Sequence, residues 1–383
     1  MSVTPEAAPA GELSALLTAV TGLREQVAES ALPLSLPGAA AADVTRTQLL
    51  NQLDDYVLPR LRSLDAPLLA VVGGSTGAGK STLVNSIVGS TVTRPGVLRP
   101  TTRSPVLVHH PDDTRWFVGD RVLPGLGRIT GAPAGAGQAG LEDISAVRLV
   151  AVDSLLPGLA LLDAPDIDSV VSSNRDLAAQ LLAAADLWLF VTTAARYADA
   201  VPWGLLRQAS ERGTSVAVVL DRVPPEAVAE IRDHLSSMLK EQGLSLAPVF
   251  TVREVPLDPA GLLRPEEIGP LKEWLTALAR DARARGMVVR HTLSGALDSI
   301  DGRIDELARA TTEQHSATRA LSKVADTAYA AAAVGVERGM SDGTLLRGEV
   351  LARWQEFVGT GEFFKQVEST VSRLRDRLVA MVK

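Results

Sequence analysis

The chain has 383 residues, of which 46% are hydrophobic, 22% charged and 4% aromatic, and it contains no cysteine. This composition excludes an intrinsically disordered chain, which would be too polar to bury a core, and it excludes a disulfide scaffold. The formal net charge of −7, from 38 basic and 45 acidic residues, argues against a dedicated nucleic-acid-binding protein, so no nucleic-acid partner is expected. A chain of this length is expected to form about two or three packed units.

Two features predict where the protein resides. No apolar run reaches the roughly 18 residues that a membrane-spanning helix needs. The first residues, MSVTPEAAPAGE, are acidic and rich in Pro and Ala, unlike a signal peptide. We therefore expect a cytoplasmic protein, with at most a peripheral contact to the inner face of the cell membrane.

Residues 1–65 show the pattern of two amphipathic helices. Apolar residues recur every three or four positions from Leu13 to Val27 and again from Leu50 to Leu64, with a Pro- and Gly-containing break at 32–38. Two helices cannot close a core by themselves. We therefore expect their apolar faces to pack against helices elsewhere in the chain, the C-terminal ones being the simplest partners.

Residues 66–285 follow a different pattern, in which short apolar runs alternate with segments of helical length. Continuous apolar runs indicate strands that are buried on both faces of a mostly parallel sheet covered by helices. The runs lie at 68–73, 105–109, 146–152, 158–162, 187–192, 215–220 and 248–252, and the helices are expected at 173–185, 202–212, 225–242 and 270–285. The stretch 124–140 is rich in Gly, Ala and Pro without periodicity and is expected to be a mobile loop.

The clearest motif is GSTGAGKS at residues 74–81, which fits the phosphate-binding pattern GxxxxGK followed by Ser or Thr, between a predicted strand and a predicted helix. Glycines let backbone amides converge on phosphate oxygens, and the helix adds the unpaired amides of its N-terminus. Lys80 can reach the β- and γ-phosphates, and the Ser81 hydroxyl can ligate Mg²⁺. A ligand-free glycine-rich turn is the simpler alternative, which the Lys-Ser pair and both flanks disfavour. The predicted nucleotide-binding residues are Gly74, Ser75, Thr76, Gly77, Ala78, Gly79, Lys80, Ser81 and Thr82.

Two later segments supply candidates for the metal side of such a site. Asp163 ends the hydrophobic run LALLD, an arrangement that brings a carboxylate near Mg²⁺, typically through water. Thr102 lies in a polar loop, and a threonine there could close over the γ-phosphate and ligate the metal only while a triphosphate is bound. The alternatives are an Asp that caps a turn and an ordinary polar loop. The same loop holds arginines that could stabilise transition-state charge or simply be solvated: Arg94, Arg99 and Arg103.

These residues resemble the bacterial dynamin-like GTPases, within the translation-factor-like class of P-loop GTPases. The resemblance is carried by VVGGSTGAGKST at 71–82 and by Thr-Arg-Ser-Pro at 102–105, close to the family's Thr-Arg-x-Pro switch. It implies GTP or GDP and Mg²⁺ as cofactors, with Lys80, Thr102 and Asp163 as catalytic residues and Ser81, Thr102 and Asp163 on the metal side. It also implies a homodimer, or a hetero-oligomer with a related GTPase, and a possible peripheral membrane contact.

The second switch and the phosphate loop depart from the family's pattern. The glycine of the family's Asp-x-x-Gly, whose amide contacts the γ-phosphate, is replaced by Asp166, a negative charge directed toward another. Thr76 and Gly77 stand where dynamins carry a Gln-Ser pair that helps to arrange the attacking water and a charge-compensating cation. Hydrolysis is therefore expected to be slow or to depend on assembly.

The guanine-reading motif departs as well. GTPases read guanine with Asn/Thr-Lys-x-Asp after a main strand, and this chain has Asp-Arg-Val-Pro at 221–224 in that place. Asp221 stands at the Asn position and Pro224 at the Asp position. Asp221 and Arg222 are our candidates for contacts with the nucleotide base, although the motif that reads guanine is incomplete.

From residue 286 to 383 no strand pattern remains. One apolar stripe runs from Leu297 to Leu307 and another from Phe363 to Leu378, which predicts an antiparallel helical hairpin or bundle. An aromatic cluster with basic neighbours favours a bundle core over a membrane-surface helix. The cluster comprises Trp354, Phe357, Phe363 and Phe364.

The sequence thus predicts an α/β P-loop domain of GTPase type, with a mostly parallel sheet covered by helices on both faces, and a helical bundle domain from the N- and C-terminal helices. The predicted boundaries are 1–65, 66–285 and 286–383. The predicted function is a dynamin-like GTPase that binds and hydrolyses GTP with Mg²⁺ and couples switch-loop ordering to bundle movement in membrane-associated remodelling. The alternatives are a pseudo-GTPase scaffold and a regulatory ribosome- or RNA-associated GTPase.

Overall fold

A computed structural model describes residues 10–93, 104–119, 121–130, 145–168, 172–342, 352–356, 365, 367–373 and 375. The chain divides into two compact units, Met1–Thr311 and Thr312–Lys383. The first unit holds the sheet and the helices around it. The predicted switch threonine Thr102 and the three arginines of its loop lie outside the described residues.

The first unit is built on an eight-stranded sheet with the strand order β3-β4-β2-β5-β1-β6-β7-β8. Every neighbouring pair is parallel except β2 with β5, which confirms the predicted mostly parallel sheet. Seven strands match the predicted apolar runs. The strands are β1 Leu68–Gly74, β2 Val106–His109, β3 Gly127–Thr130, β4 Ala146–Ala151, β5 Leu159–Asp163, β6 Leu187–Thr193, β7 Ser215–Val223 and β8 Val249–Arg253.

Strand β3 corrects the prediction of a loop across 124–140. Its four residues pair with β4 at the edge of the sheet, and their side chains are half-buried or exposed. The Arg128 guanidinium donates to the carbonyl oxygens of Phe117 and Leu126, at 2.8 and 2.6 Å, and so holds the strand to the preceding turn. This strand is held by its backbone pairing with β4 and by Arg128. It therefore does not need the apolar run by which the other seven strands were predicted.

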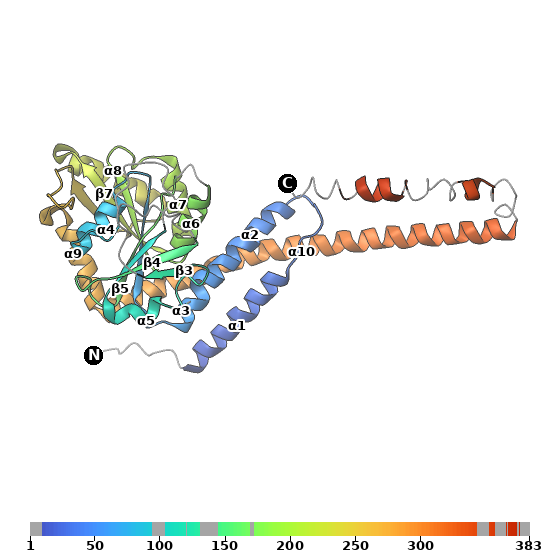
Figure 1. The fold of residues 1–383 in the computed structure, drawn as a ribbon, viewed down its shortest axis with the longest axis horizontal. Coiled ribbons are helices and arrows are strands. Elements are labelled where there is room, and N and C mark those ends of the chain that lie inside the picture. Colours follow the sequence, from blue (N-terminus) through green and yellow to red (C-terminus); the bar gives the residue numbers. More distant parts are fainter. Residues whose placement is uncertain are drawn as a thin grey trace. The chain divides into compact units, whose positions relative to one another are not determined.

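Helices cover both faces of the sheet (Figure 1). Helices α4 (Lys80–Val88) and α9 (Pro265–Arg280) close one core, and α6 (Ser172–Ala183), α7 (Ala200–Glu211) and α8 (Val228–Glu241) close the other. Alternate residues of β1 enter the two cores, which explains why the run is continuously apolar. Pro270, predicted to begin α9, lies inside that helix, because Pro265 occupies its first turn. Short helices complete the domain at Pro111–Asp113, α5 Thr114–Phe117 and Pro225–Ala227.

The N-terminal helices pack against the beginning of the long C-terminal helix, as predicted from their unpartnered faces. These elements are α1 (Ala10–Glu29), α2 (Ala39–Gln52), the π-helical turn η1 (Leu53–Val57), α3 (Leu58–Arg62) and α10 (Ala282–Ser341). Leu49, Leu53 and Val57 are fully buried in a third core that includes Leu293 and Ile300 of α10.

A buried ion pair fastens these helices to the sheet. Arg60 of α3 donates to Asp186, just before β6, at 2.8 Å, and both side chains are less than a tenth exposed. The same carboxylate oxygen accepts from the Leu69 amide at 2.8 Å, and Thr292 of α10 donates to the Asp186 carbonyl at 2.8 Å. One acidic residue therefore joins the N-terminal helices, the sheet and α10.

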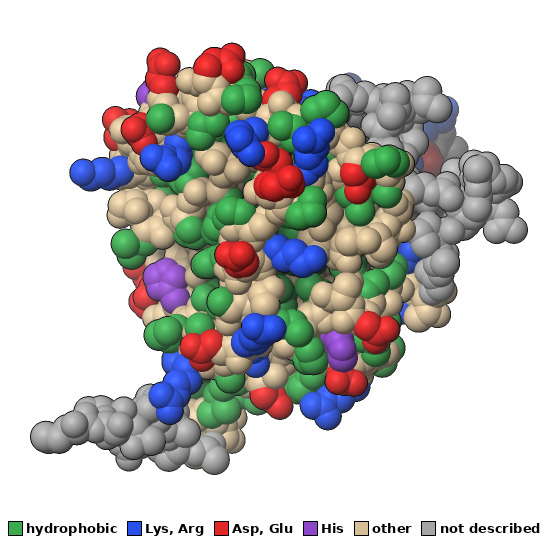
Figure 2. All heavy atoms as spheres, turned by 90° about the vertical axis from the view of Figure 1, so that its left-hand side faces the viewer, with side chains coloured by type: hydrophobic (Ala, Val, Ile, Leu, Met, Phe, Trp, Pro, Cys, Tyr) green, Lys and Arg blue, Asp and Glu red, His purple; other side chains and the backbone are tan. Residues whose placement is uncertain are grey.

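The surface of the nucleotide domain carries both signs of charge. Figure 2 shows acidic and basic side chains interspersed over one face of it, with hydrophobic side chains between them. A mixed surface of this kind lacks the single-sign field that attracts a polyanion.

The second unit contains α10 beyond Thr311 and helical residues at 352–356 and 367–373. Trp354 is 64% exposed and Val371 60%, and Phe357, Phe363 and Phe364 lie outside the described part, so the bundle core stays a prediction. Helical spacing alone shows which side chains share a face, but it does not supply a partner for that face. None of the described helices is both long and apolar enough to cross a bilayer.

Candidate functional site

The phosphate loop joins β1 to α4 and depends on glycine at three positions, one of which is Gly77 at φ +74°. Gly74 has φ +156° and Gly79 φ +91°, both in the region that favours glycine. A Cβ on Gly74 would overlap the carbonyl oxygen of Val191, and one on Gly79 would overlap the Asp221 carboxylate. The loop can adopt this conformation because Gly74 and Gly79, which lie close to other atoms of the domain, have no side chains.

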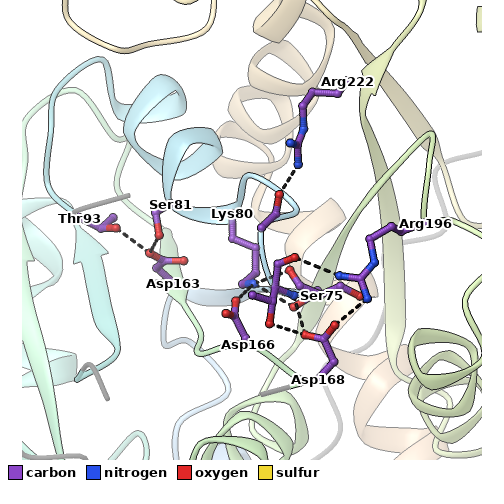
Figure 3. A network of polar contacts seen from close by, with 12 residues as sticks. Ser75, Lys80, Ser81, Thr93, Asp163, Asp166, Asp168, Arg196 and Arg222 are labelled. Atoms are coloured by element: carbon purple, nitrogen blue, oxygen red, sulfur yellow. Dashed lines mark hydrogen bonds and ion pairs between the residues drawn. The ribbon is translucent and has the colours of Figure 1, made fainter. Parts of the chain in front are cut away.

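Lys80 is buried at the start of α4 and directs its ammonium group back into the loop (Figure 3). Its Nζ donates to the carbonyl oxygens of Gly74 and Ser75, at 2.9 and 3.0 Å. It also forms an ion pair with Asp166 Oδ1 at 2.5 Å. The sequence predicted that Asp166 would direct its negative charge toward a bound phosphate. In the structure its carboxylate pairs with the Lys80 ammonium group, which is the cation that a phosphate would need.

Ser81, Asp163 and Thr93 form a second group beside the loop. The hydroxyls of Ser81 and Thr93 both donate to Asp163 Oδ2, each at 2.7 Å. Burial raises the pKa of Asp163, against the lowering effect of these two hydrogen bonds. Its other oxygen, Oδ1, is buried and has no hydrogen-bond partner within the described residues.

These residues fit a magnesium ion. Mg²⁺ takes oxygen ligands and is bound in nucleotide sites by one or two protein groups together with substrate phosphates and water. The Ser81 hydroxyl and the unpartnered Asp163 oxygen supply such a donor set. The part of the chain that the structure describes holds no group of three His, Cys, Asp or Glu side chains able to bind a metal by themselves. The phosphates of a nucleotide would therefore have to complete the site.

A third group clamps the loop from the other side. Asp168 Oδ1 accepts from both the amide and the hydroxyl of Thr76, each at 2.6 Å, and its Oδ2 accepts from Arg196 at 2.9 Å. Arg196 also donates to the Thr76 carbonyl at 3.1 Å and to Asp199 at 2.8 Å. Partial burial alone would raise the pKa of Asp168, but the hydrogen bonds from Thr76 and Arg196 outweigh it and lower that pKa.

Asp168, Arg196 and Thr93 were not among the predicted site residues. Asp168 follows β5 and Arg196 follows β6, and carboxyl ends of neighbouring parallel strands meet at one edge of a sheet. That rule could have pointed to both residues. Thr93 follows α4 in a polar segment and gave no comparable signal.

Asp221 and Arg222 lie against the loop at the end of β7. Asp221 is buried, and burial raises its pKa to about 6, against the lowering effect of its hydrogen bond with the Arg222 amide. Arg222 adopts φ +53°, a left-handed conformation that is uncommon for a side-chain-bearing residue. This conformation lets its guanidinium donate to the Gly77 carbonyl. Both predicted base-side residues therefore contact the phosphate loop.

The structure brings the predicted loop together with Asp163, Asp221 and Arg222, whereas Thr102 lies outside the described part. Ala78 is buried and its amide donates to Ser75, which closes the loop, and Thr82 lies in the first turn of α4. A parallel sheet, a glycine loop at a helix N-terminus and an acid at the end of the neighbouring strand define the P-loop GTPase-type fold.

Residues 69–223 match the family model described as the dynamin family. These residues are therefore similar to the dynamin family, and the resemblance predicted from the loop and its switch is confirmed for that part. No curated protein matches the sequence.

Several solved structures are similar to the chain. A structure described as an oligomerised bacterial dynamin pair is 12% identical with TM-score 0.42, covering 93% of this chain and 55% of that one. Toc33 from Arabidopsis thaliana with Mg²⁺ and GMPPNP is 16% identical with TM-score 0.36, covering 63% and 94%. Era in complex with MgGDPNP and nucleotides of 16S ribosomal RNA is 18% identical with TM-score 0.35, covering 55% and 56%. The chain thus spans little more than half the length of the bacterial dynamin structure, and its match to the dynamin family covers residues 69–223.

Proposed function

We propose that the protein binds GTP and GDP with Mg²⁺ and hydrolyses GTP. The observation that carries this proposal is the arrangement of one ammonium group, one hydroxyl and one carboxylate around a glycine loop: Lys80 turned into the loop, and Ser81 donating to Asp163. Phosphate oxygens would be bound by the backbone amides of the loop and by Lys80. Asp221 and Arg222 would lie on the side of the base.

Hydrolysis would be the attack of water on the γ-phosphate. Mg²⁺ would neutralise the charge that develops on the phosphate oxygens. Lys80 would stabilise the same charge, and Ser81 with Asp163 would hold the metal side, joined by Thr102 in the triphosphate state. Thr76, which stands at the position of the family's glutamine, is already held through its hydroxyl and amide by Asp168. Because Thr76 replaces the glutamine that helps to arrange the attacking water, we expect GTP hydrolysis to be slow or to depend on assembly.

We also propose that nucleotide exchange moves the helices outside the nucleotide domain. Helix α6 follows Asp166 and Asp168 in the chain, and in its last turns Gln180 donates to Asp55 at 3.0 Å. Asp55 belongs to the π-helical turn of the N-terminal helices, and such turns are frequent at functional sites. A change at the two carboxylates would thus reach the N-terminal helices through one helix. Removing the Gln180 amide (Gln180→Leu) should leave nucleotide affinity unchanged and reduce the nucleotide-dependent change in amide-hydrogen exchange at 53–57.

By the family resemblance we propose a cytoplasmic protein that works as a homodimer, or with a related GTPase, in membrane-associated remodelling. The described part of the second unit supports a partner-binding or membrane-binding role, because large apolar side chains of α10 are more than half exposed. They include Leu321, Val324, Tyr329, Val336 and Met340. Co-sedimentation with anionic vesicles, with and without GTP, tests the membrane contact.

Nucleotide specificity tests the main proposal. Titration with fluorescent GTP, GDP and ATP should show tight binding of the guanine nucleotides with Mg²⁺, and phosphate release should follow with GTP. Lys80→Ala should abolish both, whereas the exposed Lys240→Ala serves as the control and should behave as wild type. Equal behaviour of wild type and Lys80→Ala would refute nucleotide binding, and a preference for ATP would refute the guanine assignment.

The pseudo-GTPase scaffold is the second candidate, and one observation favours it. The Lys80 ammonium is already paired with Asp166, so a triphosphate must displace an internal anion before it can bind. If wild type binds none of the three nucleotides at micromolar concentration, the scaffold becomes the better assignment.

A further inference from the structure

Both the backbone and the side chain of Thr93, which follows α4, are held by hydrogen bonds. Asn85, a buried side chain of α4, accepts from the amides of Val92 and Thr93, both at 2.9 Å, and donates to the Thr93 carbonyl at 2.8 Å. Two hydrogen bonds from one side chain thus fix the backbone of Thr93, and a third fixes that of Val92. Its own side chain is 4% exposed and aims at the interior.

The group at which Thr93 aims is the Asp163 carboxylate. Its hydroxyl and that of Ser81 donate to the same oxygen, Oδ2, at equal distances of 2.7 Å (Figure 3). Two donors from different directions prevent the carboxylate from rotating about its last bond. Oδ1 then stays unpartnered among the described residues, and the Ser81 hydroxyl keeps its proton directed at Asp163, which leaves the lone pairs of Ser81 Oγ available to a cation.

We propose that Thr93 is a positioning residue for Mg²⁺, holding Asp163 in the orientation that lets Ser81 bind the ion. The proposal rests on the proposed function, because the ion is that of a bound nucleotide. Groups that orient metal ligands through hydrogen bonds often contribute as much as the ligands themselves, and their loss costs about 10–100-fold in metal affinity.

The test is the Mg²⁺ dependence of nucleotide retention by the full chain. A fluorescent GDP analogue is bound, and its dissociation rate is measured as Mg²⁺ is varied, with excess EDTA as the metal-free limit. Thr93→Val keeps the shape of the side chain and removes the hydroxyl. It should raise the midpoint, the Mg²⁺ concentration at which dissociation of the GDP analogue is slowed by half of the full effect, about tenfold or more. Thr93→Ser, which keeps the hydroxyl, should restore the wild-type midpoint, and the EDTA limit should be equal in all three proteins.

Thr192→Val is the matched control. Thr192 is fully buried in β6 and its hydroxyl has no hydrogen-bond partner in the described part of the chain, so this substitution removes a buried hydroxyl without touching Asp163. Its midpoint should equal that of wild type. Should Thr93→Val fail to fold, Thr93→Ala gives the same comparison with less crowding, each variant being checked by circular dichroism.

Three outcomes would overturn the inference: a wild-type midpoint in Thr93→Val, an equal shift in Thr93→Ser, or faster release already in EDTA. The last two would mean that packing, and not the hydroxyl, is responsible. In each case wild type still holds nucleotide in an Mg²⁺-dependent way, so only the role of Thr93 fails. If wild type itself shows no Mg²⁺-dependent nucleotide binding, the proposed function fails instead.

Discussion

Replacing Asp166 by asparagine should tighten the binding of triphosphate more than that of diphosphate. In the structure its carboxylate pairs with Lys80 at 2.5 Å, the cation that the γ-phosphate would need. A bound triphosphate therefore has to break this pair, and it then places further negative charge beside the freed carboxylate. Asparagine keeps the shape of the side chain and removes both costs.

The magnitude follows from Coulomb's law and from the exposure of the carboxylate. Two unit charges about 4 Å apart interact by about 1 kcal/mol in water and about 4 kcal/mol at the effective dielectric near a protein surface. The Asp166 side chain is 37% exposed, so screening favours the lower part of this range. A gain of about 1–2 kcal/mol corresponds to binding of a non-hydrolysable GTP analogue that is tighter by about 5–30-fold.

The assay is competition against a fluorescent guanine nucleotide at fixed Mg²⁺, at about 0.15 M and about 1 M salt. Asp166→Asn should bind the triphosphate analogue more tightly than wild type, with a smaller gain for GDP, and high salt should shrink the difference because it screens exposed charge. The exposed Asp176→Asn on α6 removes the same formal charge away from Lys80 and should change neither affinity. Unchanged or weaker triphosphate binding in Asp166→Asn would refute the reasoning.

Three further changes test other parts of the structure. Arg60→Met leaves a buried carboxylate without its counter-ion and should lower the free energy of unfolding by about 3–5 kcal/mol in urea titration, with the exposed Arg62→Met nearly neutral. Burial raises the pKa of Asp221 from 3.8 to about 6, so the folded state binds more protons than the unfolded one and loses stability as pH rises from about 4 to about 6. Asp221→Asn should therefore gain up to about 3 kcal/mol over wild type at pH 7, and that gain should vanish near pH 4 in parallel denaturant titrations. Gly79→Ala should abolish nucleotide binding because its Cβ would overlap a carboxylate at a positive φ, whereas Gly204→Ala, with open space around it, should bind normally in the same fluorescence titration.

The sequence predicted those parts of the molecule that local patterns encode. Seven strands carry continuous apolar runs because their side chains enter both cores, although the edge strand β8 is mostly half-buried, and the phosphate loop is a contiguous motif whose glycines report backbone conformation. Asp163 could be placed because it ends a strand next to β1. Strand β3 was missed because backbone pairing and Arg128 hold it in place of an apolar run.

Contacts between distant segments could not be predicted in the same way. Thr76, Asp168 and Arg196 come from three different loops, and their pairing depends on strand order and on side-chain directions that no local periodicity records. Thr93 reaches Asp163 only because Asn85 fixes its backbone. A helical stripe likewise does not state what packs against it, so the packing of Trp354 stays a prediction.

The charges of the site indicate that phosphate binding is an exchange of anions. Within the described residues, the carboxylates of the loop region outnumber its cations. Lys80 is paired with Asp166, and Arg196 with Asp168 and Asp199, while Asp163 lies beside Ser81 with no cation of a described residue within salt-bridge distance. A polyphosphate would add further negative charge to this set, so the proposed binding would call for both Mg²⁺ and the withdrawal of at least one carboxylate. Asp166 and Asp168 lie in the chain just before α6, whose Gln180 contacts the N-terminal helices, so a withdrawal of either carboxylate would occur where the proposed coupling to those helices begins.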